Sequence, residues 1–407
     1  MIAAFASENH FQTYEDETSS SFSANCNVLL AILNSQDASL YAKEVNSTVA
    51  YLVDAFENGT IHDKWNLSPE YSMMLLCRAL AALVLRWNSG EVDFLSSELI
   101  QHKLPAIFCQ ALMQVSQRQQ DDGSWEHSPE ATSYAIIAIS HILPMPWHPC
   151  VQRYGHFILQ KGRRFLEANM NLCGITHYHW VEKVSFSSTV LSKAYCLAAM
   201  RDTAQAYVLS PETRQIFSVK DEFIAKMKVL IQETPLFRIQ PVEVIDVLLS
   251  VSFYYFKRLQ AINVAIFPER NRGKDKYLRI VPFSWIGCNF LNNLTLSGIC
   301  LWDMMVLSRF IYILDEYMEN VVGNLSTASL TSIKLTLQGK CHMENDVTCC
   351  QNSETASGLE RARLDEIVQI LERFVDHICS HPRVVKSKQS LQAQMRGQLY
   401  SFLLAYI

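Results

Sequence analysis

Apolar residues recur every three or four positions along almost the whole chain, which is the period of a helix with an apolar face. In the first half the clearest segments lie at residues 28–33, 71–85, 107–115, 133–143 and 187–200. In the second half they lie at residues 243–255, 301–322 and 364–378. Alternating runs typical of strands, bounded by turn residues, are missing, so the pattern predicts an all-α protein.

Short polar stretches, such as Asp122-Gly123-Ser124, separate the predicted helices of the first half. Helices that alternate with such loops predict an antiparallel α/α toroid, in which each helical pair buries a face against the next. A polar join at residues 210–215 precedes longer and more hydrophobic helices. We therefore place a domain boundary near residue 210, and we interpret the polar segment 338–358 as an exposed loop.

Composition narrows the classes of function. Of the 407 residues, 49% are hydrophobic and 18% are charged, so the chain can bury large cores. A net charge of −5 gives no strong attraction to nucleic acid or anionic lipid. No uncharged apolar run reaches the ~18 residues of a membrane span, and the N-terminus does not resemble a signal peptide. We interpret the 12 scattered cysteines as reduced, buried thiols of a cytoplasmic protein.

The predicted helix 301–322 combines an apolar body with the acidic string Asp315-Glu316-Tyr317-Met318-Glu319. It is apolar nearly all round, which predicts a buried helix. Helical spacing places Ser308, Tyr312, Asp315 and Glu319 on one face. Two carboxylates one turn apart can hold Mg²⁺ together with the phosphate oxygens of a substrate. The alternative is a helix end that emerges into water, with Glu316 paired to Arg309.

A second distinctive string, Gln-Gln-Asp-Asp-Gly-Ser-Trp, runs from Gln119 to Trp125 between two predicted helices. Asp122 and Gly123 supply a turn, and the Trp125 ring can stack on a neighbouring amide. The pattern indicates that Gln119, Asp122, Gly123 and Trp125 brace helices and do not carry out catalysis.

Three further clusters give weaker signals. A run of four cations could bind a diphosphate, with a solvated charged loop as the alternative: Arg270, Arg272, Lys274 and Lys276. The spacing of Cys341-His342 and Cys349-Cys350 matches no zinc pattern, so no zinc site is predicted. Residues 177–183 could line a pocket, but their aromatic content favours the start of a helix.

Several strings together resemble a known family. Gln119 to Trp125 is similar to the helix-bracing repeat of triterpene cyclases and class II diterpene cyclases. Other strings resemble, in the same order, the fungal bifunctional diterpene cyclases of the copalyl diphosphate/ent-kaurene synthase type: residues 22–30, 63–68, 180–184, 282–285 and 315–319. That family carries an Asp-Glu-Phe-Met-Glu motif, in which Tyr317 replaces the Phe here. The resemblance runs from about His10 to the last residue.

The resemblance implies a fold, a reaction and a cofactor. Residues 1–210 would be part of a class II α/α toroid, and residues 211–407 the first part of a class I α domain. In the family, the toroid protonates geranylgeranyl diphosphate at an Asp-x-Asp-Asp motif, giving copalyl diphosphate. The α domain then removes the diphosphate with Mg²⁺, and the resulting cation cyclises to a diterpene. Carried over to this chain, Asp315 and Glu319 would bind Mg²⁺, with Glu316 a weaker candidate.

The resemblance also suggests a carbon–oxygen lyase of the terpene synthase class, with geranylgeranyl or copalyl diphosphate as the partner. The chain departs from the family pattern in two ways. It contains no Asp-x-Asp-Asp, which lies upstream of the matched stretch in the family, so we expect a partial chain. The second metal motif is also missing, because Cys349 and Ser353 stand where Ser or Thr and Glu belong.

We therefore expect this chain to be impaired or inactive alone. The alternative is a non-catalytic, decayed cyclase that acts as a helical binding or partner protein. A helical-toroid glycosidase is disfavoured, because the first half shows no persuasive carboxylate pair. The diterpene product and the oligomeric state stay open.

Overall fold

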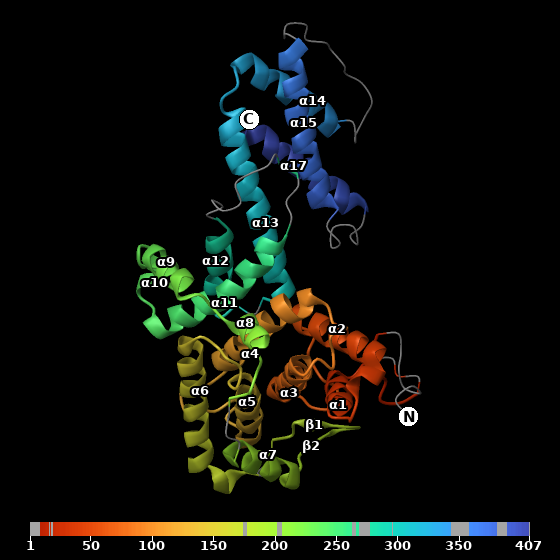
Figure 1. The fold of residues 1–407 in the computed structure, drawn as a ribbon, viewed down its shortest axis with the longest axis vertical. Coiled ribbons are helices and arrows are strands. Elements are labelled where there is room, and N and C mark those ends of the chain that lie inside the picture. The colour runs from red at the N-terminus through yellow and green to blue at the C-terminus, as the bar shows by residue number, and fades with distance from the viewer. Residues whose placement is uncertain are drawn as a thin grey trace. The chain divides into compact units, whose positions relative to one another are not determined.

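The computed structural model describes residues 9–15, 17, 19–173, 177–201, 206–262, 266–267, 277–294, 296–342, 358–380 and 389–406. Within these ranges almost every element is a helix, so the predicted all-α class is confirmed (Figure 1). None of these helices combines the length and the apolar character needed to cross a membrane.

Contacts divide the chain into two compact units. Unit 1 consists of Met1–Ala261 with Leu278–Met304, and unit 2 consists of Ile262–Tyr277 with Met305–Ile407. The boundary expected near residue 210, between the toroid-like part and the α-domain-like part, does not coincide with this division by contacts. That boundary stays a prediction.

Most of the helices belong to unit 1. A short β-hairpin at residues 180–186 divides its elements. Before the hairpin they are α1 (Phe22–Leu33), η2 (Ala38–Tyr41), α2 (Ala42–Asn58), α3 (Pro69–Asn88), η3 (Glu98–Lys103), α4 (Leu104–Gln117), α5 (Pro129–Ile142), α6 (Pro149–Ala168) and η4 (Met170–Leu172). After the hairpin come α7 (Thr189–Arg201), α8 (Pro211–Phe217), α9 (Asp221–Gln232), α10 (Pro235–Arg238), α11 (Val242–Ala261) and nearly all of α12 (Tyr277–Leu291).

Helix α13 (Gly298–Tyr317) begins in unit 1 and ends in unit 2. Unit 2 then contains η6 (Met318–Val322), α14 (Thr327–His342), α15 (Gly358–Cys379) and α17 (Gln389–Tyr406). Side chains from α13, α14, α15 and α17 build the apolar core of this unit. Among the described residues the cysteines are free thiols, and those at 26, 77, 109, 150, 173 and 196 are buried.

Helices α3 and α5 form the centre of unit 1. They lie side by side (Figure 1), and α3 also packs on α1, whereas α5 also packs on α6 and α7. Nearly every residue of α5 is buried, because the helix is surrounded by α3, α4, α6 and α7. Ser128 begins this helix by accepting a hydrogen bond from the Ala131 amide at 3.3 Å. The centre of unit 1 is therefore built by helix packed on helix.

A small hairpin interrupts the helices. Strand β1 (Trp180–Val181) pairs antiparallel with β2 (Ser185–Phe186), with Trp180 opposite Phe186. Backbone hydrogen bonds tie the first strand to the segment before α3, since Val181 N–H donates to the Trp65 carbonyl at 3.0 Å. The expected helix start at residues 177–183 is wrong, because aromatic and β-branched residues favour a strand once a pairing partner exists.

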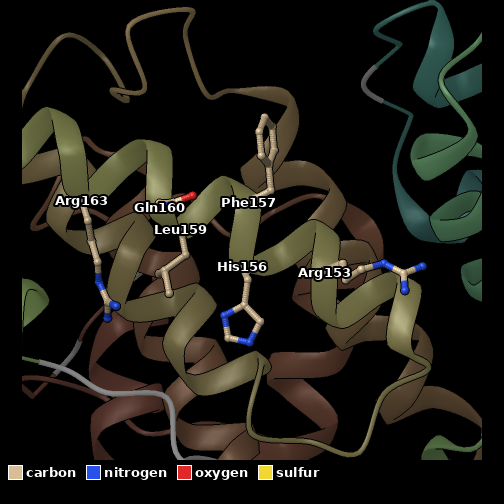
Figure 2. Close-up of a pocket in the computed structure, with 6 residues that line it drawn as sticks. All are labelled: Arg153, His156, Phe157, Leu159, Gln160 and Arg163. Carbon is tan, nitrogen blue, oxygen red and sulfur yellow. The ribbon is translucent and has the colours of Figure 1, made fainter.

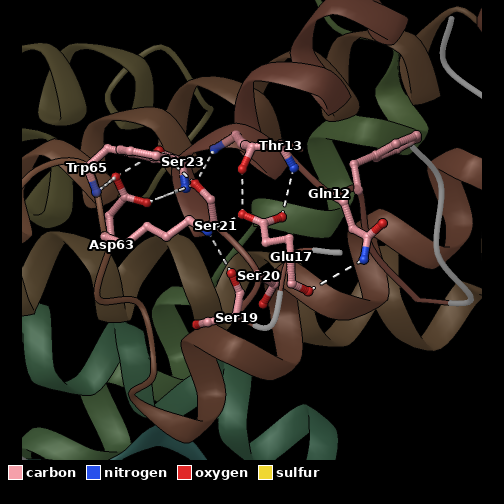
Figure 3. Close-up of polar contacts among 12 residues, drawn as sticks. Gln12, Thr13, Glu17, Ser19, Ser20, Ser21, Ser23, Asp63 and Trp65 are labelled. Atoms are coloured by element: carbon pink, nitrogen blue, oxygen red, sulfur yellow. Dashed lines mark hydrogen bonds and ion pairs between the residues drawn. The ribbon is translucent and has the colours of Figure 1, made fainter. Parts of the chain in front are cut away.

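Two of the strings that carry the family resemblance meet at the start of α1. The Asp63 carboxylate accepts hydrogen bonds from the Ser21 hydroxyl at 3.0 Å and the Ser23 hydroxyl at 2.8 Å (Figure 3). It also accepts from the Trp65 amide at 3.2 Å. Hydrogen bonds of Asp63 therefore connect residues 22–30 with residues 63–68, which is a physical reason for finding both strings in one chain.

Candidate metal and diphosphate site

The acidic string lies where α13 passes into the π-helical turn η6. One side of this helix end packs in the core of unit 2 through Phe310, Ile313, Leu314, Tyr317 and Met318. The Tyr317 ring lies against the Phe267 ring, with centroids 5.4 Å apart. Because these apolar side chains are fixed by packing, they also fix the direction in which the neighbouring carboxylates leave the helix.

The other side of the helix end carries the acidic residues. Asp315 and Glu316 are half-buried, and Glu319 is exposed. On the same helix Ile311 is 38% and Tyr312 39% exposed, so the expectation of a helix buried nearly all round is wrong. The described core of unit 2 packs against the side that carries Phe310, Leu314 and Tyr317, and the acidic side is partly accessible.

The carboxylates of Asp315 and Glu319 are not used by the fold. Within the described ranges neither carboxylate has a hydrogen-bond or ion-pair partner. Arg309, the alternative partner of Glu316, is buried, and its Nη1 donates to the Ile262 carbonyl at 3.2 Å. The Glu316–Arg309 pairing stays a prediction. The helix end therefore presents at least two carboxylates to a ligand.

These donors fit Mg²⁺ by their chemistry. Mg²⁺ prefers oxygen ligands and is usually held by one or two carboxylates, with water and substrate phosphates completing its shell. Among the described residues, no group of three or more His, Cys, Asp or Glu side chains is arranged to hold a metal ion. A magnesium ion bound by Asp315 and Glu319 stays a prediction.

An aromatic pair lies beside the acidic side chains. The Tyr277 and Tyr312 rings stack with centroids 4.3 Å apart and planes 6° from parallel. Tyr312 precedes Asp315 by three residues, so helical spacing places it on the same face. Arg270, Arg272, Lys274 and Lys276, the expected diphosphate ligands, lie outside the described residues, as does the incomplete second motif at residues 345–353.

The Gln119–Trp125 loop joins three helices of unit 1. The Trp125 ring is fully buried, and its Nε1–H donates to the Val115 carbonyl of α4 at 2.7 Å. Its backbone N–H contacts the Thr132 hydroxyl of α5 at 3.0 Å. Gln119 Nε2 donates to the Ile158 carbonyl of α6 at 3.0 Å. The loop uses its own polar atoms to hold α4, α5 and α6 together.

Gly123 and Asp122 shape the turn of this loop. Gly123 has φ +91°, and a Cβ atom there would lie 2.5 Å from the Lys161 carbonyl oxygen, so only glycine fits. Asp122 Oδ1 accepts from the Ser124 amide at 2.9 Å and the Ser124 hydroxyl at 2.6 Å. Partial burial acts to raise the pKa of Asp122, but these hydrogen bonds outweigh it and lower the pKa.

An open hollow of about 530 Å³ follows the surface of α6 (Figure 2). Its lining comes from one helix: Arg153, His156, Phe157, Leu159, Gln160 and Arg163. A prenyl chain needs apolar walls on several sides. Because this hollow has one wall and contains none of the predicted site residues, we do not assign the substrate to it.

Glu70 and Glu130 are two of several buried carboxylates that the sequence analysis did not identify. Glu70 and Glu130 are 1% and 3% exposed. Each follows a Ser-Pro pair at the start of a helix, in Ser68-Pro69-Glu70 and Ser128-Pro129-Glu130. An acidic residue in the first helical turn is favoured by the unpaired amides there. The Ser-Pro-Glu string, which begins both helices, was the sequence signal that could have identified these two carboxylates.

A helical chain with the bracing loop and an acidic helix end has the features of a terpene cyclase. No family model matches the chain. The chain is 31% identical, over its whole length, to 44% of pimaradiene synthase pbcA of Emericella nidulans. It is 28% identical, again over its whole length, to 43% of the bifunctional ent-kaurene synthase of Gibberella fujikuroi.

A third relative matches one half of the chain. Over 211 residues, 50% of this chain and 22% of the relative, it is 35% identical to the copalyl diphosphate synthase of Talaromyces verruculosus. These relatives are fungal diterpene synthases, so the predicted resemblance is confirmed, and the chain is a homologue of this enzyme family. It spans less than half the length of the curated relatives that it matches along its whole length.

Proposed function

We propose that the chain carries part of a class I diterpene synthase site, which ionises a prenyl diphosphate and leads to a cyclic diterpene. The substrate would be geranylgeranyl or copalyl diphosphate, and the cofactor Mg²⁺. One observation carries the proposal: Asp315 and Glu319 are unpartnered within the described ranges, on a helix end whose other side is fixed in a core. Homology to fungal diterpene synthases supplies the reaction class.

The residues of this chain have distinct parts in the proposed chemistry. Asp315 and Glu319, with Glu316 beside them, would hold Mg²⁺, which when bound neutralises charge on the leaving diphosphate. Packing of Leu314 and Tyr317 orients the carboxylates before the substrate arrives, so less free energy is lost in arranging them. The stacked Tyr312 ring adds aromatic surface next to this site and helps to keep water away.

The chain contains no Asp-x-Asp-Asp and no complete second metal motif. We therefore propose that it does not protonate geranylgeranyl diphosphate, and that its class I activity is weak or absent when it acts alone. The buried free thiols support a reducing compartment, and we place the protein in the cytoplasm. A second candidate function is a non-catalytic helical binding or partner protein, which the incomplete motif set favours.

Binding measured by calorimetry distinguishes the two candidates. Purified chain is titrated with geranylgeranyl diphosphate or copalyl diphosphate, with and without Mg²⁺. We expect Mg²⁺-dependent binding that weakens at least about tenfold in the Asp315→Ala, Glu319→Ala double variant, because a tenfold loss needs only ~1.4 kcal/mol. The matched control is Asp365→Ala, Glu366→Ala, which removes two exposed carboxylates of α15.

Equal binding by the chain and both double variants would contradict the metal site and favour the non-catalytic function. Products are followed in parallel by gas chromatography with mass spectrometry. Substantial copalyl diphosphate formed from geranylgeranyl diphosphate would contradict the missing protonation step. Abundant hydrocarbon formed from copalyl diphosphate would contradict the impaired class I step.

A further inference from the structure

A polar cluster in unit 1 joins the start of α3 to the loop before α5. The Ser68 hydroxyl lies 3.2 Å from Oε2 of Glu70 and 3.0 Å from Oε1 of Glu126. A hydroxyl has one proton, so it can donate to only one of these two carboxylates at a time. The Ser68 side chain makes no capping hydrogen bond to α3, so its role is in this cluster.

The cluster has fewer positive charges than carboxylates. Arg118 Nε donates to Oε1 of Glu70 at 2.5 Å, which compensates that buried carboxylate. A second buried carboxylate, Glu130 of α5, faces the same region and accepts from Trp180 Nε1 at 2.9 Å. The one guanidinium among these groups pairs with Glu70, which leaves both Glu126 and Glu130 without a guanidinium or ammonium partner among the described residues.

His179, which precedes β1, faces the cluster and does not supply a cation. His179 Nδ1 lies 3.7 Å from Oε2 of Glu126, and its Nε2 lies 3.2 Å from the Ser128 hydroxyl. Burial, with a contribution from neighbouring His177, lowers the pKa of His179 and favours its neutral form. The His177 ring stacks on it at 5.4 Å.

The chain at Glu126 is also held in an uncommon conformation. Glu126 and His127 have φ +53° and +49°, in the left-handed region that residues with a Cβ seldom adopt. Such backbone persists only where its surroundings hold it. The backbone hydrogen bond from the Ser128 amide to the Trp125 carbonyl at 2.9 Å closes this turn. The contact of Glu126 with Ser68 and the 3.2 Å contact between His127 and Asp122 add side-chain support.

We propose that Glu126 carries a proton beside Glu70 and the Ser68 hydroxyl, and that this contact is a pH-sensitive latch. The latch, defined as Ser68, Glu70, Arg118, Glu126 and His179, holds the left-handed turn against the start of α3. It also holds the hairpin, because the Leu67 amide donates to the His179 carbonyl at 2.7 Å. Loss of the proton leaves two facing carboxylates whose repulsion opens the latch.

The direction of the pH effect follows from the environment. Burial, with Glu70 alongside, raises the pKa of Glu126 to about 7, above its ordinary value of 4.5. A raised folded-state pKa means that the stabilisation is fully present below the ordinary value and is lost as the pH rises through about 7. The latch is therefore closed in mildly acidic solution and opens in mildly alkaline solution.

Hydrogen exchange with mass spectrometry tests the latch through peptides that cover residues 63–69 and 177–186. The chain is compared with Glu126→Gln, which cannot lose the proton, at equal pH so that intrinsic exchange rates cancel. We expect equal protection at pH 4, below the ordinary value of 4.5, and at least about tenfold faster exchange of the unaltered chain at pH 8, one unit above the Glu126 pKa. Glu167→Gln, an exposed carboxylate on α6, is the control and should behave as the unaltered chain.

A second variant keeps the proposal testable if Glu126→Gln does not fold. Ser68→Ala removes a donor that stabilises the charged carboxylate, so the opening midpoint should move to higher pH. Equal exchange of the unaltered chain and Glu126→Gln at pH 8 would overturn the latch. A Ser68→Ala midpoint that stays or falls would overturn it as well.

Discussion

The Gln119–Trp125 loop and the acidic end of α13 are both polar strings next to apolar helices, but they use their polar atoms in opposite ways. In the loop, side chains of Gln119 and Trp125 donate to carbonyls of the surrounding helices. At the end of α13, the carboxylates of Asp315 and Glu319 have no partner within the described part of the chain.

This difference separates a bracing string from a ligand-binding one. A buried polar group that lacks a partner is costly, so a string whose function is structural satisfies its own donors and acceptors. A string that binds a ligand leaves some donors or acceptors accessible until the ligand arrives. The packing of Tyr317 against Phe267 shows that the helix end is not simply frayed, because its apolar side is anchored.

The largest effect is expected from Trp125→Ala. The variant empties a fully buried site and removes the donor to the Val115 carbonyl, so the free energy of unfolding should fall by about 3–5 kcal/mol. Urea unfolding followed by circular dichroism measures the change. Leu40→Ala, at a side chain that is 76% exposed, should change it by less than ~0.5 kcal/mol. Similar losses of unfolding free energy in Trp125→Ala and Leu40→Ala would contradict the bracing role of the loop.

A smaller loss is expected from Gly123→Ala. Its Cβ would meet the Lys161 carbonyl at 2.5 Å in a left-handed conformation, so we expect a loss of roughly 2–3 kcal/mol. Gly90→Ala is the matched control, since Gly90 has φ +79° but its nearest neighbour would be 3.7 Å away. That variant should lose about 1 kcal/mol. If Gly123→Ala and Gly90→Ala lose the same free energy of unfolding, the close approach of the loop to α6 does not contribute to stability.

The sequence predicts the helical fold well because the apolar periodicity is local. Helices α5, α11 and α13 coincide with runs in which apolar residues recur at helical spacing. The hairpin at Trp180 was missed for the opposite reason. Its strands are two residues long and depend on pairing with each other and with residues 65–67, which no local pattern records.

The candidate sites show the same contrast between local patterns, which the sequence predicts, and contacts between distant segments, which it does not. Spacing on one helix predicts Asp315 and Glu319 on one face, which stays a prediction, and the turn at Gly123 follows from residue type. Spacing could not show that the side of α13 near Tyr312 stays accessible, because that depends on which neighbours build the core. Nor could it bring Glu70 and Glu126 to one hydroxyl, since they come from segments far apart in the chain.

The smallest effect on stability is expected at the acidic helix end. Without ligand, Asp315→Ala, Glu319→Ala should change the free energy of unfolding by less than ~0.5 kcal/mol, because within the described ranges neither carboxylate has a hydrogen bond or ion pair to lose. With Mg²⁺ and a prenyl diphosphate, the unaltered chain should gain stability as the ligand binds the folded state, by about 2.7 kcal/mol at a hundredfold excess over Kd.

The double variant should lack that gain, whereas Asp365→Ala, Glu366→Ala should keep it. Urea unfolding with and without ligand measures both quantities on the same samples. A loss of more than about 1 kcal/mol without ligand would show that the carboxylates stabilise the fold as the bracing loop does. The contrast between the two strings would then be one of degree, because each would contribute to stability through contacts within the protein.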